Sequence, residues 1–221
     1  MIKHLSRTMN GYYLRDTKSD IKYLGGTKVE SHFFAMMARM KYIERWALMR
    51  NAEVENISEH SMEVAMLTHA LATIGNARLG KSLNAERGAL IGLFHDCTEI
   101  ITGDMPTPIK YYSEDITSAF QEIEEKAASK LLGMLPEDMR KYYEALFYEK
   151  EEDAYLWRLK KAADKISAVV KCIKEEKAGN TEFISAKKTL ESSLDEMGLD
   201  EVAIFKDEFL PSYYKTLDEL H

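Results

Sequence analysis

The sequence predicts an all-α protein, and three observations support this fold class. The 221 residues include only 4 prolines and 11 glycines, which disfavours an all-β fold because such folds need many turns. Apolar residues recur at spacings of three and four along most of the chain, and no run alternates with period two over a strand's length. The composition, 45% hydrophobic and 30% charged, is that of a globular chain. We therefore expect a bundle of about seven helices joined by short loops.

The first thirty residues differ from the rest of the chain. Residues 1–30 mix tyrosines with charged residues and a Gly-Gly pair, and they show no sustained period. We interpret them as an N-terminal extension. The helical pattern begins at Ser31, so residues 31–221 are expected to form a single helical domain.

Capping residues and breakers mark where the expected helices begin and end. Ser58 is the expected N-cap of one helix and Asn84 that of the next, which stops near Asp96. A loop then follows, because Gly103 and Pro106 prevent a helix from continuing. The apolar stripes place the helices at about residues 31–43, 58–74, 84–96, 120–131, 153–177, 183–194 and 202–210.

Charge and cysteine content exclude several classes of protein. A net charge of −7 disfavours a nucleic-acid binder that tracks phosphates, although it does not exclude a local basic pocket. Two cysteines, Cys97 and Cys172, are too few for a disulfide framework or a Cys-rich zinc site and fit a reducing cytosol. The apolar stretches 64–74 and 89–94 are shorter than the roughly 20 residues of a membrane span, and the N-terminus has no secretory signal. We therefore expect a cytoplasmic protein without a nucleic-acid or membrane partner.

Histidine and aspartate side chains suggest a metal site. His95 and Asp96 are adjacent at the end of an expected helix, and His60 opens the preceding one. Adjacent helical residues point about 100° apart, so His95 and Asp96 can bind one ion only if the helix ends or bends there. The downstream Gly/Pro loop favours such an end. Imidazole and carboxylate together suit Co, Mn, Fe, Ni or Zn.

A further ligand must come from another part of the chain, and Asp164 is the candidate. It lies on the longest expected helix beside small residues, where an aspartate needs a cation or a hydrogen-bonding partner if it is buried. The alternative is a solvated ion pair that contributes little to stability, with Lys160, Lys161 or Lys165. Spacing alone favours that alternative, and His95-Asp96 alone could be a chance dipeptide. The combination favours a metal site.

The pattern of His60, His95-Asp96 and Asp164 resembles the H…HD…D signature of the HD-domain phosphohydrolases. Longer blocks resemble the bacterial 5′-deoxynucleotidase (5′-nucleotidase) branch of that family, from about Ser31 to the Pro211-Ser212 tail. The HD pair alone is weakly specific, whereas the Arg-Trp and Thr-Gly-Asp-x-Pro-Thr-Pro blocks are far more specific. The blocks are residues 43–51, 55–61, 95–99 and 102–111.

The resemblance implies an HD-domain helical bundle with one divalent ion, Co, Mn or another transition metal. Glu99 and Asp104 would position the attacking water or protonate the leaving oxygen, and the division of these roles between them stays open. No histidine lies between His95 and the last residue, His221, which argues against a two-metal member of the family. The implied metal ligands are His60, His95, Asp96 and Asp164.

The resemblance also implies a substrate site. Arg45 would bind and orient the phosphate, because a guanidinium fork suits that anion. Trp46 would form a wall beside the sugar and base and would disfavour a ribose 2′-hydroxyl. Thr107 would add a contact to the substrate, and His60 and Asp104 would also face it.

Trp46 and Arg45 could also have purely structural roles. Without the family blocks, Trp46 at helical spacing from Ile43 would be placed in the core. Arg45 would simply pair with Glu44 or Glu53.

The function that follows is a metal-dependent 5′-deoxynucleotidase, a phosphoric monoester hydrolase. It would hydrolyse deoxyribonucleoside 5′-monophosphates to deoxynucleoside and phosphate. The alternatives are an HD phosphohydrolase acting on another nucleotide, a triphosphate or a cyclic one, and a non-catalytic HD module that binds metal or nucleotide. Members of the resembling family pair as dimers, so the resemblance implies a homodimer.

Overall fold

The computed structural model describes residues 5–8, 11–15, 21–24 and 30–220. Within the expected extension, three short strands form an antiparallel sheet in the order β1-β2-β3. The sequence pattern does not predict them, because elements of four or five residues are too short for alternation to stand out. Residues 1–4, 9–10, 16–20 and 25–29 of the expected extension lie outside the described residues. The strands are β1 (Leu5–Thr8), β2 (Gly11–Arg15) and β3 (Ile21–Leu24).

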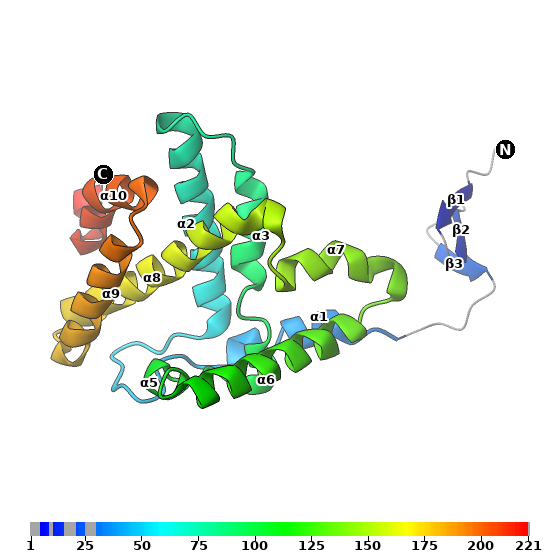
Figure 1. Ribbon diagram of the computed structural model, residues 1–221, viewed down its shortest axis with the longest axis horizontal. Helices are drawn as coiled ribbons and strands as arrows, with labels where there is room; N and C mark the ends of the chain where they lie inside the picture. Colours follow the sequence, from blue (N-terminus) through cyan, green and yellow to red (C-terminus); the bar gives the residue numbers. More distant parts are fainter. Residues whose placement is uncertain (1–4, 9–10, 16–20, 25–29, 221) are drawn as a thin grey trace.

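The remainder of the described chain is helical (Figure 1), which confirms the all-α class. Seven of its described α-helices have nine residues or more, and six of these seven correspond to expected helices. No helix among the described residues is long and apolar enough to cross a membrane. The α-helices are α1 (Phe33–Met37), α2 (Ile57–Arg78), α3 (Ala85–Phe94), α4 (Glu99–Thr102), α5 (Thr107–Lys110), α6 (Glu114–Gly133), α7 (Glu137–Phe147), α8 (Ala154–Lys177), α9 (Ile184–Glu196) and α10 (Asp200–Glu208). The 3-10 helices are Met40–Tyr42, Glu151–Asp153, Thr181–Phe183, Leu210–Tyr214 and Leu217–Leu220.

The helices differ from the expected ones at several points. The helix expected at residues 31–43 is only α1 followed by a 3-10 turn, and α7, an amphipathic helix, was not among the expected helices. The N-cap of α2 is Asn56 and not Ser58. The Asn56 side chain accepts hydrogen bonds from the backbone N–H of Ser58 at 3.0 Å and of Glu59 at 3.1 Å, as an N-cap does.

Helices α2, α3 and α8 form the centre of the core (Figure 1), with α8 packed across both of the others. Their inward faces are fully buried, and each large aliphatic side chain there contributes about 1.5–3 kcal/mol by leaving water. Gly92 permits the close approach of α3 to α2, since a Cβ at that position would lie 2.8 Å from the Ala65 Cα. The approach brings the end of α3 beside the start of α2. Side chains buried in this core include Val64, Leu71, Ile91, Leu159, Ile166, Val170 and Ile173.

A buried ion pair on α8 fastens the loop that precedes α2. Lys171 and Glu175 are only 2% and 1% exposed in their side chains and pair with each other. Glu175 also accepts hydrogen bonds from the backbone N–H of Ala52 at 2.8 Å and of Glu53 at 3.2 Å, and Lys171 donates to the Glu53 carbonyl at 2.5 Å. The loop that follows Arg45 is therefore held against α8 by charged hydrogen bonds.

Replacing Glu175 with glutamine is expected to lower the free energy of unfolding by about 3 kcal/mol, because it leaves Lys171 buried without its counter-charge. Burial alone would raise the pKa of Glu175, but Lys171 and the backbone N–H groups lower it from 4.5 to about 2. The stabilisation is therefore complete above about pH 4.5 and is lost as the pH falls toward 2. Denaturant unfolding at pH 7 and at pH 3 measures both effects.

The neighbouring Glu176→Gln is the matched control, since Glu176 pairs with Lys187 at the surface. It should change the free energy of unfolding by less than about 1 kcal/mol. Equal losses for Glu175→Gln and Glu176→Gln would contradict the role given to the buried pair.

Candidate metal and substrate site

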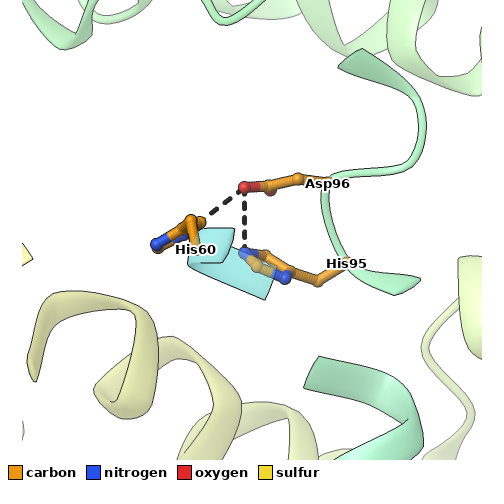
Figure 2. Close-up of side chains that lie close together, drawn as sticks. All are labelled: His60, His95 and Asp96. Atoms are coloured by element: carbon orange, nitrogen blue, oxygen red, sulfur yellow. Dashed lines mark ion pairs between the residues drawn. The ribbon is translucent and has the colours of Figure 1, made fainter. Parts of the chain in front are cut away.

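Three of the expected metal ligands converge where α2 begins and α3 ends (Figure 2). The His60 Nε2 atom lies 3.5 Å from Asp96 Oδ2, and the His95 Nε2 atom lies 3.0 Å from the same oxygen. One ligand atom from each residue lies within 4.8 Å of the other two. A tetrahedral ion with bonds of about 2.1 Å separates its ligands by about 3.4 Å. The spacing therefore suits one ion.

The end of α3 explains how adjacent residues reach one point. The helix ends at Phe94, and His95 to Thr98 form a turn before α4. This confirms the expected helix end and frees Asp96 from the angular spacing of a regular helix. His60 reaches the same point from the first turn of α2, and its ring lies 5.2 Å from that of His95 between centroids.

Asp164 joins the cluster from α8. Its Oδ1 atom lies 3.1 Å from His60 Nε2 and 3.9 Å from Arg45 Nη2, and its side chain is 41% exposed. Asp164 thus lies on the open side of the cluster, next to His60. The surface ion pair that spacing alone favoured does not form within the described residues: Lys160, Lys161 and Lys165 are all more than ion-pair distance from it.

The ring nitrogens of the two histidines are oriented to bind an ion. Within the described residues, His60 Nε2 and His95 Nε2 are buried and have no hydrogen-bond partner. The Nδ1 of His95 lies 2.7 Å from the carbonyl oxygen of Gly92, so it carries the proton and leaves Nε2 with its lone pair. Two imidazole nitrogens and two carboxylates fit a borderline divalent cation.

The carboxylate of Asp96 is also prepared for an ion. Burial alone would raise its pKa, but the neighbouring His95 and His60 hold the pKa of Asp96 well below its usual range. Asp96 is therefore ionised at neutral pH. An ionised carboxylate is the form that binds a cation.

Glu99 and Asp104 lie beside the cluster. Glu99, the first residue of α4, is only 9% exposed, and its Oε2 is buried without a hydrogen-bond partner in the described part of the chain. Burial and the charges of Asp96 and Asp104 raise the pKa of Glu99 to about 10. Burial also raises the pKa of Asp104, with Asp96 adding to it and Arg45 opposing it. A pair of carboxyl groups with raised pKa values in one site is typical of acid–base chemistry.

Arg45 lies between the cluster and a partner that the sequence did not reveal. Its guanidinium pairs with Glu55, whose side chain is only 10% exposed, and its Nη2 faces Asp164 at 3.9 Å. The expected alternatives, Glu44 and Glu53, are not its partners. Glu55 lies at the end of the loop that begins at Arg45. The backbone N–H of Arg45 also donates a hydrogen bond to the Glu55 carbonyl at 2.9 Å.

Trp46 is not a core residue but part of the wall of a cavity. It is the non-glycine residue with a positive φ, 62°, in the described part of the chain, a conformation that costs about 1–3 kcal/mol and is concentrated at functional sites. Its ring packs edge-on against Phe183 with centroids 5.3 Å apart, and the Arg45 guanidinium lies 5.7 Å from the Trp46 ring centroid. Its indole Nε1 is buried without a hydrogen-bond partner there.

The cavity has a volume of about 560 Å³, which is within the usual range for a small-molecule site. Arg45 and Asp104 supply its charged groups, and the rest of its lining is mostly apolar. Thr107, which the resemblance implies as a substrate contact, is among the lining residues, whereas the residues of α9 were not expected because they carry no motif. The α9 residues are Ser185, Ala186, Thr189 and Leu190, and the other lining residues are Trp46, Ala47, Leu48, Met49, Met105, Pro106, Pro108 and Tyr111.

Comparison with known proteins agrees with this geometry. Residues 32–213 match the model of the family described as 5′-deoxynucleotidase YfbR-like. The chain belongs to this family. It is 46% identical to a 5′-deoxynucleotidase of Erwinia tasmaniensis over 192 residues, which cover 87% of this chain and 97% of that protein.

Solved structures show the same fold. An HD-domain phosphohydrolase of Listeria innocua matches with a TM-score of 0.72 at 20% identity, covering 82% of this chain and 88% of that one. The HD phosphohydrolase of cyanophage S-2L, solved with dA and one catalytic Zn²⁺ ion, matches with a TM-score of 0.56 at 18% identity, covering 82% of this chain and 96% of that one. This YfbR-like chain therefore has the HD-domain helical bundle.

Proposed function

We propose that this YfbR-like protein is a metal-dependent 5′-deoxynucleotidase that converts deoxyribonucleoside 5′-monophosphates to deoxynucleoside and phosphate. One observation carries the proposal. The His60, His95 and Asp96 cluster adjoins a largely apolar cavity through Arg45, whose guanidinium lies 3.9 Å from Asp164 and also lines the cavity. A phosphate held at Arg45 would place its nucleoside in the cavity. The name of the Erwinia tasmaniensis relative, 5′-deoxynucleotidase, supports the same substrate class.

The four ligands would hold one divalent transition-metal ion, such as Co, Mn or Zn. The proposed ligand atoms are two imidazole nitrogens and two carboxylate oxygens. Such an ion lowers the pKa of a water molecule and neutralises the charge of a phosphate. The catalytic Zn²⁺ of the cyanophage phosphohydrolase supports an ion of this type. The proposed ligands are His60, His95, Asp96 and Asp164.

The chain's own residues divide the hydrolysis among them. Glu55 pairs with Nη1 of Arg45, and Nη2, which faces Asp164 at 3.9 Å, is the side of the guanidinium that binds the phosphate oxygens. Asp104 lines the cavity and Glu99 does not, so Asp104 is closer to the nucleoside. Glu99 takes a proton from the attacking water as the oxygen of that water bonds to phosphorus. Asp104 donates a proton to the nucleoside 5′-oxygen as the phosphorus–oxygen bond breaks.

The cavity also suits a deoxyribonucleoside. Trp46 is held by Phe183 and by the loop conformation, so its ring is a rigid wall. A sugar packed against the face of the Trp46 ring finds no hydrogen-bond partner there for a 2′-hydroxyl, whose burial without a hydrogen bond is unfavourable. Thr107, which also lines the cavity, supplies a hydroxyl that can bind the substrate.

Phosphate release tests the proposal. The purified protein is treated with EDTA and then supplied with Co²⁺, Mn²⁺, Zn²⁺ or Mg²⁺, and phosphate is measured with the deoxyribo- and ribonucleoside 5′-monophosphates. We expect turnover only after metal is restored, and faster turnover of the deoxy forms. Absence of turnover with every metal would support a non-catalytic binding module. Equal turnover of ribo and deoxy forms would contradict the role of Trp46.

Substitution of Arg45 by methionine is expected to raise the KM for a deoxyribonucleoside monophosphate by about 10–100-fold. The change removes hydrogen bonds to a charged group, each contributing about 1.5–3 kcal/mol, while it keeps most of the side chain's aliphatic length. The affinity for the metal should change little, because Arg45 is not a ligand. Arg45→Lys keeps the charge without the fork and should recover part of the loss. Wild-type KM in Arg45→Met would exclude Arg45 from the site.

We further propose that residues 31–221 are the catalytic domain, with residues 1–30 as an extension, and that the protein works in the cytoplasm as a homodimer. The family match from residue 32 to residue 213 supports the domain boundary. Two buried free cysteines support a reducing compartment. Large apolar side chains exposed on α2 and α3 offer a surface for self-association. They are Met62, Met66, Leu90 and Leu93.

A further inference from the structure

A buried chain of polar side chains extends from His60 away from the metal ligands. The Nδ1 atom of His60 lies 3.1 Å from Ser167 Oγ, and Ser167 Oγ lies 2.5 Å from Glu63 Oε2. The His60 and Ser167 side chains are fully buried. Glu63 reaches the surface, where its other oxygen lies 3.6 Å from Lys174 Nζ. None of these contacts with Ser167 or Glu63 was expected from the sequence.

The order of donors and acceptors in this chain fixes the proton of His60. A serine hydroxyl has one proton, and Ser167 donates it to the carboxylate of Glu63. Ser167 Oγ can therefore only accept from His60, so the proton of the neutral imidazole lies on Nδ1. The Nε2 atom, which faces Asp164 at 3.1 Å and Asp96 at 3.5 Å, is then left with its lone pair.

The helical positions show why these residues act together. Glu63 follows His60 by three residues on α2, and Ser167 follows Asp164 by three residues on α8. Residues three apart lie on the same face of a helix. The two helices that supply the proposed ligands His60 and Asp164 thus also supply, one turn further on, the two residues of the chain that extends from His60.

We propose that Ser167 and Glu63 are positioning residues that set the tautomer and ring orientation of His60 for metal binding. The inference rests on the proposed role of His60 as a ligand. Ser167 accepts the Nδ1 proton, and Glu63 fixes the direction of the Ser167 hydroxyl. His95 obtains the same orientation from the backbone carbonyl of Gly92, so the His60 side of the site is the one that side-chain substitution can disturb.

Metal affinity of the full-length protein tests the proposal. Ser167→Ala leaves the Nδ1 proton without an acceptor and is expected to weaken Co²⁺ binding by about 10–100-fold, as is typical for partners of metal-binding histidines. Glu63→Gln should cause a smaller loss of Co²⁺ affinity. The glutamine amide can still accept a hydrogen bond from Ser167, but it can also donate one and so reverse the direction of the hydrogen bonds. Competition with a chelator measures both dissociation constants.

Ser61→Ala is the matched control. Ser61 is fully buried on α2 next to His60, and its hydroxyl has no hydrogen-bond partner within the described residues. Its Co²⁺ affinity should equal that of the wild type. Equal Co²⁺ affinities of Ser167→Ala and the wild type would overturn the proposal, whereas a wild type that binds no Co²⁺ would overturn the proposed metal site itself.

Nuclear magnetic resonance provides a readout that does not depend on the Ser167 and Glu63 variants folding. In the Zn²⁺-loaded wild type with ¹⁵N-labelled histidine, the His60 Nδ1 proton should be visible and protected from exchange with water. Assignment uses the loss of this signal in His60→Asn. A His60 ring without a protected Nδ1 proton would overturn the proposal even if Ser167→Ala cannot be purified.

Discussion

Replacement of Asp96 by alanine is expected to abolish metal binding and phosphate release together. Asp96 Oδ2 is the atom shared by the two closest contacts of the cluster, at 3.0 Å from His95 Nε2 and 3.5 Å from His60 Nε2. Without it the two imidazoles lose the anion that they face. An ion in such a site contributes several kcal/mol to the reaction, and each 1.36 kcal/mol is a factor of ten. The rate should therefore fall by at least about 10³-fold.

Three measurements on Asp96→Ala check this expectation. Metal analysis after dialysis should find no stoichiometric ion, and phosphate release should not recover when Co²⁺ is added. The melting temperature should also lose its dependence on Co²⁺, since an ion that binds only the native state stabilises it by linkage. Asp207→Ala, at an exposed position on α10, should behave like the wild type. An Asp96→Ala variant that keeps a tenth of the activity would contradict the role of Asp96.

Substitution of Glu99 or Asp104 by its amide is expected to reduce kcat by about 10²–10⁴-fold, the usual contribution of a positioned acid or base. Both variants should retain the metal, because neither residue is a proposed ligand. Burial and the charge of Asp96 raise the pKa of Glu99 to about 10. A dication bound beside Asp96 opposes that charge and lowers the value. A lower pKa is what the role of base requires of Glu99.

The two roles predict opposite pH dependences. Glu99 must be deprotonated to act as the base, so the rate falls as the pH drops below its pKa. Asp104 must be protonated to act as the acid, so the rate falls as the pH rises above its pKa, which burial raises. The wild-type profile of kcat should be bell-shaped. Glu99→Gln should lose the acid limb and Asp104→Asn the alkaline limb.

A substrate with a better leaving group separates the two residues. When a deoxynucleoside 5′-phosphorothiolate is hydrolysed, the leaving group is the 5′-thiolate of the deoxynucleoside. This group needs no proton to leave, because the pKa of a thiol is low. Asp104→Asn should regain most of its lost rate with this substrate, whereas Glu99→Gln should not. The reverse result would exchange the two roles, and equal losses on both substrates would contradict the use of either residue as the acid.

Much of the ligand cluster was predictable because its signals are local. The His95-Asp96 pair, the Gly/Pro loop after it and the helix end that it requires lie within a short stretch, and the structure places that end at Phe94. The association of Asp164 with this pair was not predictable from spacing, which favoured a lysine partner. It came from the resemblance to the HD-domain family, and the packing of α8 against α2 accounts for it.

The parts that the sequence did not reveal depend on contacts between distant segments. Ser167 and Glu63 meet only because α2 and α8 cross, and their positions resemble any polar residue beside an apolar stripe. Glu55 could not be distinguished from Glu44 and Glu53 as the partner of Arg45, because the loop conformation decides between them. The α9 wall of the cavity carries small and apolar side chains, which the pattern of an ordinary packed helix also contains.

X-ray absorption and metal titration of the full-length protein test the central hypothesis most directly, namely that side chains from α2, α8 and the turn after α3 share a single ion. We predict one Co²⁺ per chain, with a coordination sphere that contains two imidazole nitrogens and carboxylate oxygens and that changes when a deoxyribonucleoside monophosphate is added. Two ions per chain, or a sphere without imidazole, would contradict the single-ion site built from His60, His95, Asp96 and Asp164.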